Sequence, residues 1–142
     1  MISAAYHIWM NTHQWISFLL ERKRGYKRIG FIKCASLNNM VVYFNSIGFN
    51  HLIHKRPPRS REDQIYRLNL IPYATNIIED KNLSIVYRSL NIKGKLVHYW
   101  GLEKIFGNKS IRVVIRQVGN GRKHFYSIME HTSKNPAKSE IL

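Results

Sequence analysis

Residues 83–130 read LSIVYRSLNIKGKLVHYWGLEKIFGNKSIRVVIRQVGNGRKHFYSIME, and they carry the strongest structural signal in the chain. Four segments rich in β-branched and aromatic residues follow one another here, a composition typical of strands. These segments are residues 83–90, 95–102, 110–117 and 124–130. The connections NIKG and VGNGRK contain glycine, which hairpin turns favour. The stretch therefore predicts an antiparallel meander of four strands.

Upstream of the meander, MVVYF at residues 40–44 predicts a short strand, and NSIGFNHLIHK after it predicts a turn and a short helix. Ser60 is expected to cap a second helix, with acidic side chains in its first turn. This helix would run as far as Glu79, and Pro72 would kink or break it. Its inward positions would be Ile65, Leu68, Ile71 and Ile78.

The N-terminal segment 4–24 predicts an amphipathic helix that packs on the core or on another copy of the chain. Its apolar side consists of Ile8, Trp9, Trp15, Phe18, Leu19 and Leu20. The basic run RKRGYKR, residues 22–28, is expected to be a phosphate-contacting edge or a solvated loop. We therefore expect an α+β fold in which N-terminal helices pack on a four-stranded antiparallel β-sheet.

The length of 142 residues is typical of a single domain. Residues 1–36 would form the N-terminal helix and a basic linker, residues 37–132 the core, and residues 133–142 a loose tail. The N-terminal stretch is expected to be neither a signal peptide nor a membrane span, because polar residues interrupt its apolar run. The lone Cys34 excludes an internal disulfide and a cysteine-rich zinc site, which favours a reducing, cytosolic site of action.

The charge balance indicates a polyanionic partner. The chain has 23 Lys and Arg against 8 Asp and Glu, a formal net charge of +15. A field of this size attracts nucleic acid and accelerates encounter with it. An acidic partner protein is the second interpretation, and a solvated basic surface is the third.

Cleavage of RNA without a metal needs a base for the 2′-hydroxyl, an acid for the leaving 5′-oxygen, and cations around the phosphate. His, Lys and Arg supply these groups, and the chain is rich in them. It is poor in the carboxylates that a two-metal nuclease needs. The composition therefore favours chemistry without a metal or another cofactor.

His51 and His54 are three residues apart, so a helix would place both on one face, next to Lys55. Imidazole titrates near neutral pH, which suits an acid or a base. A structural role or a metal-ligand role is the alternative for this pair.

Alternation along the strands predicts which side chains share a face. Arg112 and Arg116 would lie on the side opposite the apolar residues Ile111, Val113 and Ile115. Arg88 would lie on the sheet face opposite to that of Tyr87. The arginines of the strands and their aromatic rings would be available to RNA. Exposed strand positions and core packing are the alternatives for these side chains.

In the last strand, Ser127 is expected to share a face with Phe125 and Met129, whereas His124 and Tyr126 alternate with it. The hydroxyl of Ser127 would bond a phosphate oxygen beside an arginine, or simply a neighbouring backbone group. The aromatic side chains Tyr87, Tyr99, Trp100 and Tyr126 would stack on bases or pack in the core.

The order of a strand, GFNHLIHK, a helix with REDQIYRLNLI, and a meander ending in RVVIRQVGNGRKHFYSIME resembles the nuclease superfamily of barnase, EndoU, colicins and RelE. The phage- and mobile-element-associated branches are most similar, and the resemblance covers residues 40–130. It implies a toxin-type ribonuclease that cleaves RNA without metal to a 2′,3′-cyclic phosphate. It also implies a helical layer packed on a four-stranded antiparallel sheet.

Carried over by position, the resemblance implies catalytic roles for His51, Arg88, Arg116 and Ser127, with His54 assisting or replacing His51. The candidate substrate-binding residues are Lys55, Arg112, Tyr87, His98, His124 and Tyr126. The expected partners are RNA (tRNA, mRNA or ribosomal RNA) and an acidic antitoxin or immunity protein. A non-catalytic RNA- or DNA-binding module, or an interaction protein for an acidic partner, is the alternative function.

Overall fold

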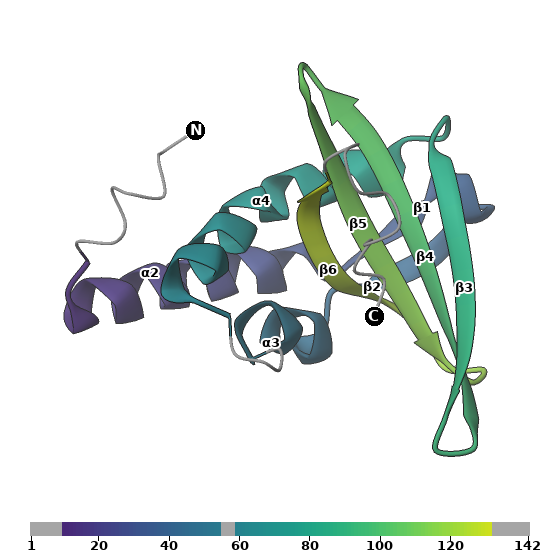
Figure 1. Ribbon diagram of the computed structural model, residues 1–142, viewed down its shortest axis with the longest axis horizontal. Coiled ribbons are helices and arrows are strands. Elements are labelled where there is room, and N and C mark those ends of the chain that lie inside the picture. Colours follow the sequence, from purple (N-terminus) through teal and green to yellow (C-terminus); the bar gives the residue numbers. More distant parts are fainter. Residues whose placement is uncertain (1–9, 55–58, 132–142) are drawn as a thin grey trace.

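The structure, a computed structural model, describes residues 10–54 and 59–131 and has an α+β architecture. Its helices lie to one side of a six-stranded mixed sheet (Figure 1). The helices are α2 (Thr12–Ile29), the 3-10 helix η1 (Ala35–Leu37), α3 (Ser46–His54) and α4 (Arg61–Glu79). The strands are β1 (Phe31–Cys34), β2 (Met40–Tyr43), β3 (Ser84–Ile92), β4 (Lys95–Phe106), β5 (Lys109–Val118) and β6 (Lys123–His131). The predicted α+β class is confirmed.

The sheet has the strand order β1-β2-β6-β5-β4-β3. Strands β3 to β6 form the predicted antiparallel meander, and β2 joins its β6 side through a parallel pairing. The prediction of a four-stranded, wholly antiparallel sheet is therefore wrong. The strand predicted at residues 40–44 is β2, which joins the sheet through its parallel pairing, and its partner β1 was not predicted because four residues are too few to show clear alternation.

The turns of the meander match the glycines of the sequence. Lys93 and Gly94 connect β3 to β4 with φ angles of 51° and 81°. Two central residues with positive φ make the hairpin turn whose twist matches that of the strands. Val118 ends β5 and Lys123 begins β6, which confirms the second predicted hairpin.

Helix α4 begins where the sequence predicts, because the Ser60 hydroxyl accepts a hydrogen bond from the Asp63 backbone N–H at 3.1 Å. The helix continues through Pro72 to Glu79, so the proline does not break it. Pro72 lies on the exposed side and costs the helix one backbone hydrogen bond. The predicted inward residues are all buried, namely Ile65, Leu68, Ile71 and Ile78.

Helix α2 differs from its prediction at the C-terminal end. Residues 22–28 belong to the helix, so they are neither a loop nor a linker. Tyr26 is buried, its hydroxyl donates to the Asn45 backbone oxygen at 2.6 Å, and its ring contacts Phe44 and Phe49. This anchor holds the basic run against the core. The first part of the predicted helix, residues 4–9, lies outside the described residues.

The apolar side of α2 is also rotated from the expected one. Phe18 is buried and lies eight residues before Tyr26, so both occupy one helix face. Leu20 was expected inward but is 51% exposed, because it is two residues from Phe18 on the helix. Among the described residues, no helix combines the length and the apolar character needed to cross a bilayer.

The main core lies between the helices and one face of the sheet. Ile111, Val113 and Ile115 of β5 enter this core, as the alternation predicts. A second, smaller cluster of Val97, Tyr99, Val114 and Met129 lies on the opposite face. The face with this smaller cluster carries most of the candidate functional residues.

Candidate active site

The sheet face that turns away from α2 and α4 carries one row of polar and aromatic side chains. Register pairs Arg88 with Tyr99, Tyr99 with Arg116, and Arg116 with His124. Paired residues point to the same face, so the predicted orientation of Arg88 and Arg116 is confirmed. Because strands lie about 4.8 Å apart, Arg88 is about 10 Å from Arg116 along the row.

A β-bulge in the β5–β6 pairing shapes the middle of this face. Val114 pairs with Ser127 and Ile115 pairs with Phe125, which leaves Tyr126 as the extra residue. Ser127 and Phe125 therefore lie on opposite faces, and the prediction that they share one is wrong. The inserted residue reverses the alternation of side chains, which a pattern of period two does not reveal.

The bulge residue Tyr126 lies at the centre of a cluster of side chains. The His51 ring stacks on the Tyr126 ring at 3.9 Å between centroids and an interplanar angle of 23°. The guanidinium carbon of Arg116 is 5.1 Å from the Tyr126 ring centroid. The rings of Tyr99 and His124 are 5.8 and 6.3 Å away. We refer to these five residues as the Tyr126 cluster.

His51 reaches the cluster because α3 packs very closely against β6. A Cβ on Gly48 would lie 2.1 Å from the Phe125 backbone oxygen, so only glycine allows this approach. Nδ1 of His51 is 3.1 Å from the Tyr126 backbone oxygen and donates to it. In the neutral ring, Nε2 is then the unprotonated nitrogen, which is the atom that accepts a proton.

Burial sets the protonation of His124 and Tyr126. Burial, followed by the positive charge of Arg116, lowers the pKa of His124, which keeps the ring neutral at pH 7. Its Nε2 is buried and has no hydrogen-bond partner in the described part of the chain. Burial also raises the pKa of the Tyr126 hydroxyl, although the charges of Arg116 and Arg59 act in the opposite direction. The phenol therefore stays protonated at neutral pH.

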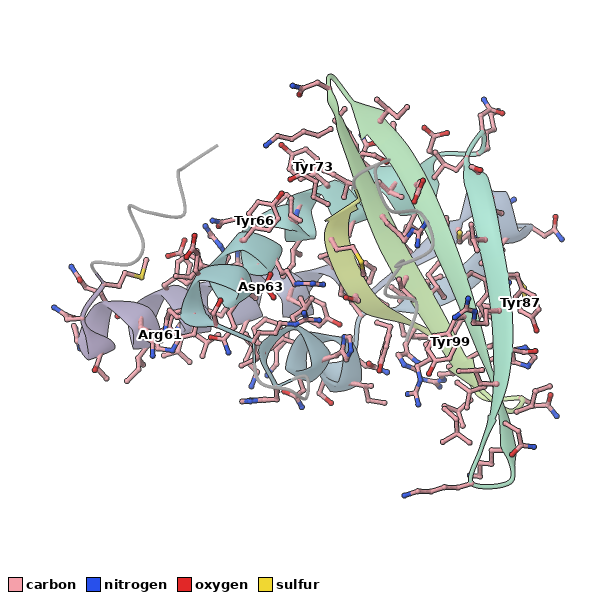
Figure 2. The ribbon with its side chains drawn as sticks, in the orientation of Figure 1. Arg61, Asp63, Tyr66, Tyr73, Tyr87 and Tyr99 are labelled. Carbon is pink, nitrogen blue, oxygen red and sulfur yellow. The ribbon has the colours of Figure 1, made fainter. Side chains whose placement is uncertain are left out.

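Helix α4 and the residue before its cap supply two arginines that sequence reasoning missed. Arg67 is 7% exposed, and its Nη1 donates to the Ser127 hydroxyl and to the Ile128 backbone oxygen, both at 3.3 Å. Asp63, labelled in Figure 2, binds Nε of Arg67 and Nη1 of Arg59, both at 3.2 Å. The spacing of four between Arg59, Asp63 and Arg67 is the signal that would have found them.

Other predicted residues lie away from the cluster. Tyr87 and His98 lie on the opposite sheet face, where the Tyr87 hydroxyl and His98 Nδ1 share a hydrogen bond of 2.5 Å. Figure 2 shows Tyr87 and Tyr99 on different sides of β3. Arg112 shares the face of the cluster, but its Nε donates to Glu103 at 2.8 Å, and the two side chains form a partly buried ion pair.

The remaining candidates lie at the periphery of the cluster or outside the described residues. Arg88 is exposed on the edge strand, at the far end of the row. His54 is exposed at the last position of α3, whereas His51, one turn earlier, is half-buried. Lys55 lies outside the described residues. Of the residues predicted to be catalytic, the structure brings His51 and Arg116 together on the Tyr126 ring, whereas Ser127, the next residue in the chain, is buried and bonded to Arg67.

Within residues 10–54 and 59–131, no three His, Cys, Asp or Glu side chains gather as a metal-binding group. No protein-family model, curated protein or solved structure matches this chain. The geometry and charge of the Tyr126 cluster are therefore the basis for assigning a function.

Proposed function

We propose that this protein is a metal-independent endoribonuclease of the toxin type that acts in the cytosol. The observation that carries this proposal is the Tyr126 cluster, in which a histidine, an arginine and a protonated tyrosine meet on one sheet face. These groups supply the base, the cation and the acid that cleavage by 2′-hydroxyl attack requires. The net charge of +15 supplies the attraction for RNA.

In the proposed reaction, Nε2 of His51 takes the proton of the 2′-hydroxyl as the 2′-oxygen forms a bond to phosphorus. The bond from phosphorus to the 5′-oxygen breaks, and this oxygen takes the proton of the Tyr126 hydroxyl. The products are a 2′,3′-cyclic phosphate and a 5′-hydroxyl end. Transfer of the proton from His51 to the Tyr126 phenolate through water then restores both groups.

Arg116 has the role of stabilising the negative charge on the phosphate during this reaction. Its side chain is half-buried, and its guanidinium is close to both the Tyr99 and Tyr126 rings. His124 stays neutral beside Arg116, because burial and the charge of the guanidinium both lower its pKa, so Arg116 is the cation at this position of the cluster. Arg67 and Ser127 hold the bulge in position. They do not touch the substrate and act on it only through the placement of Tyr126.

The same proposal includes membership of the barnase, EndoU, colicin and RelE superfamily. Strands β3 to β6 provide a four-stranded antiparallel unit, and helix α4 contacts three of its strands from one side. The hairpin β1–β2 and helix α2 are additions to that unit. This arrangement supports the proposal through topology alone.

The test is incubation of the purified protein with total RNA in EDTA, followed by sequencing of the RNA ends. We expect discrete fragments with 2′,3′-cyclic phosphate ends from the wild-type protein. The variants His51→Gln, Arg116→Gln and Tyr126→Phe should each cleave at least about 100-fold more slowly. Arg24→Gln, an exposed position on α2, removes the same charge and should cleave normally. Intact RNA with the wild-type protein would rule the proposal out.

A non-catalytic RNA-binding module is the second candidate. It is favoured by the burial of Ser127 and of His124, which are 1% and 4% exposed. Such a module would bind RNA in a salt-dependent way without cleaving it. Cleavage that survives EDTA and is lost in the His51 variant would eliminate this candidate.

A toxin-type ribonuclease is expected to stop growth when it is expressed and to have an acidic antitoxin or immunity protein. The chain has an excess of 15 positive charges. An acidic partner that covers the basic sheet face would therefore be complementary to it in charge. Induced expression of the wild-type chain should arrest growth, and expression of His51→Gln at equal protein level should not. Equal growth of the two cultures would contradict the toxin assignment.

A further inference from the structure

The row of side chains on the face of the Tyr126 cluster continues beyond His124 onto the first two strands. Tyr43 of β2 pairs with His124 in the parallel register, and Phe31 of β1 pairs with Tyr43. All three side chains therefore point to the same face. The row runs from Arg88 at one edge of the sheet to Phe31 at the other.

Phe31 and Tyr43 form an accessible aromatic surface. Phe31 is 59% exposed, and its ring centroid is 5.9 Å from that of the half-buried Tyr43. The guanidinium carbon of Arg122 lies 4.6 Å from the centroid of the Tyr43 ring. Tyr43 itself pairs with His124 of the cluster, which follows Arg122 by two residues. The aromatic surface is thus coupled directly to the cluster.

Aromatic rings with an arginine beside them are the side chains on which nucleic-acid bases stack. Phe31 lies on an edge strand and leaves more than half of its surface exposed, so its apolar ring is available to a ligand. A base inside a duplex already stacks on its neighbours and does not reach such a surface. The surface therefore selects an unpaired base.

We propose that Phe31, Tyr43 and Arg122 form a stacking subsite for an unpaired RNA base next to the scissile phosphate, and that the substrate is single-stranded RNA. The identity of the ligand as RNA rests on the proposed function. The subsite itself rests on the register, the exposed rings and the position of Arg122. Because stacking tolerates every base, the subsite adds affinity with little preference for sequence.

A second aromatic patch on the opposite sheet face provides the matched control. There Tyr87, which is 52% exposed, lies 5.5 Å from Trp100 and hydrogen-bonds to His98. Lys123 covers the other part of this patch, with Nζ 5.0 Å from the Trp100 ring centroid. RNA bound at the Tyr126 cluster does not reach this patch without passing around the sheet edge.

The experiment measures binding of a fluorescent single-stranded 2′-O-methyl RNA, which lacks the attacking hydroxyl and stays intact, by fluorescence anisotropy. We expect Phe31→Ala and Arg122→Gln each to weaken binding about 5- to 10-fold, and Tyr43→Ala by up to about 100-fold. Tyr87→Ala should bind as the wild type does. A duplex of the same sequence should bind all four variants within about twofold of its affinity for the wild type.

Failure of this subsite is distinguishable from failure of the proposed function. If Tyr87→Ala weakens binding and Phe31→Ala does not, or if no variant changes it, the subsite is overturned whatever the cleavage assay gives. If the variants behave as expected and the wild type does not cleave RNA, the subsite stands and the ribonuclease proposal falls. Circular dichroism of each variant, with the exposed Phe31→Ala as the main comparison, keeps loss of folding separate from loss of binding.

Discussion

At the scale of single residues, Arg67 is the side chain whose removal should cost the most stability. It is almost fully buried, and it binds Asp63, the Ser127 hydroxyl and the Ile128 backbone oxygen. Arg67→Ala removes this donor from the buried Ser127 hydroxyl and Ile128 backbone oxygen and leaves Asp63 with Arg59 alone, and we expect a loss of about 3 kcal/mol in the free energy of unfolding.

Urea unfolding measures this change, and Arg24→Ala is the control because that arginine is exposed on α2. The control should differ from the wild type by no more than about 0.5 kcal/mol. An equal effect of both substitutions would show that Arg67 contributes only its helix propensity.

His124 should make the stability of the protein depend on pH. Burial lowers its pKa from the ordinary value of 6.5, so the unfolded chain binds more protons than the folded one at acidic pH. The contribution of His124 is fully present above pH 6.5 and is lost as the pH falls through the folded pKa. Unfolding free energies measured from pH 7.5 to pH 5 should fall less steeply for His124→Gln than for the wild type. His13→Gln, an exposed position on α2, should keep the full slope.

At the scale of secondary-structure elements, the contact between α3 and β6 positions His51. Gly48→Ala would bring a methyl group to 2.1 Å from the Phe125 backbone oxygen and 2.7 Å from the Tyr26 hydroxyl. The helix has to move, and we expect a loss of about 2–3 kcal/mol in stability together with a loss of cleavage. Calorimetry and the cleavage assay measure the two effects.

The control for this prediction is a second helical glycine, Gly25 in α2. A Cβ there meets nothing within 4 Å, so Gly25→Ala should raise stability by about 0.5–1 kcal/mol through helix propensity. Stabilisation by both substitutions would contradict the close packing of α3 on β6.

Most elements were predictable because their signals are local. Gly94 has a positive φ in the β3–β4 turn, and Ser60 caps the start of α4. A few local residues therefore determine where this turn and this helix begin. The errors arose where a distant contact decides the structure. Tyr26 extends α2 because it packs in the core, and β1 is a strand only because β2 pairs with it.

At the scale of the whole molecule, the positive charge should make RNA binding depend strongly on salt. For single strands, log Kd changes with log salt by about 0.7 for each phosphate contact. Arg88→Gln removes one cation from the row on the sheet face and should reduce this slope by about 0.7. Arg24→Gln, on the helical side, should leave the slope unchanged. Anisotropy titrations at several salt concentrations measure it.

The candidate site was predictable only in its chemistry. Composition and charge indicated His and Arg acting on RNA, but His51 and Tyr126 are 75 positions apart and meet through tertiary packing. The β-bulge at Tyr126 interrupts the alternation of side chains, and the sequence HFYSIM contains no signal that predicts it. Local patterns report which face a side chain occupies, and they do not report which strands become neighbours.

The place of β6 in the sheet has a consequence for synthesis of the protein. This strand comes last among the described elements, yet it lies between β2 and β5 and joins the two parts of the sheet. A nascent chain that ends before Lys123 has two separate strand groups, each with a free edge, and lacks Tyr126. The Tyr126 cluster therefore assembles only after β6, the last of the described strands, has been translated.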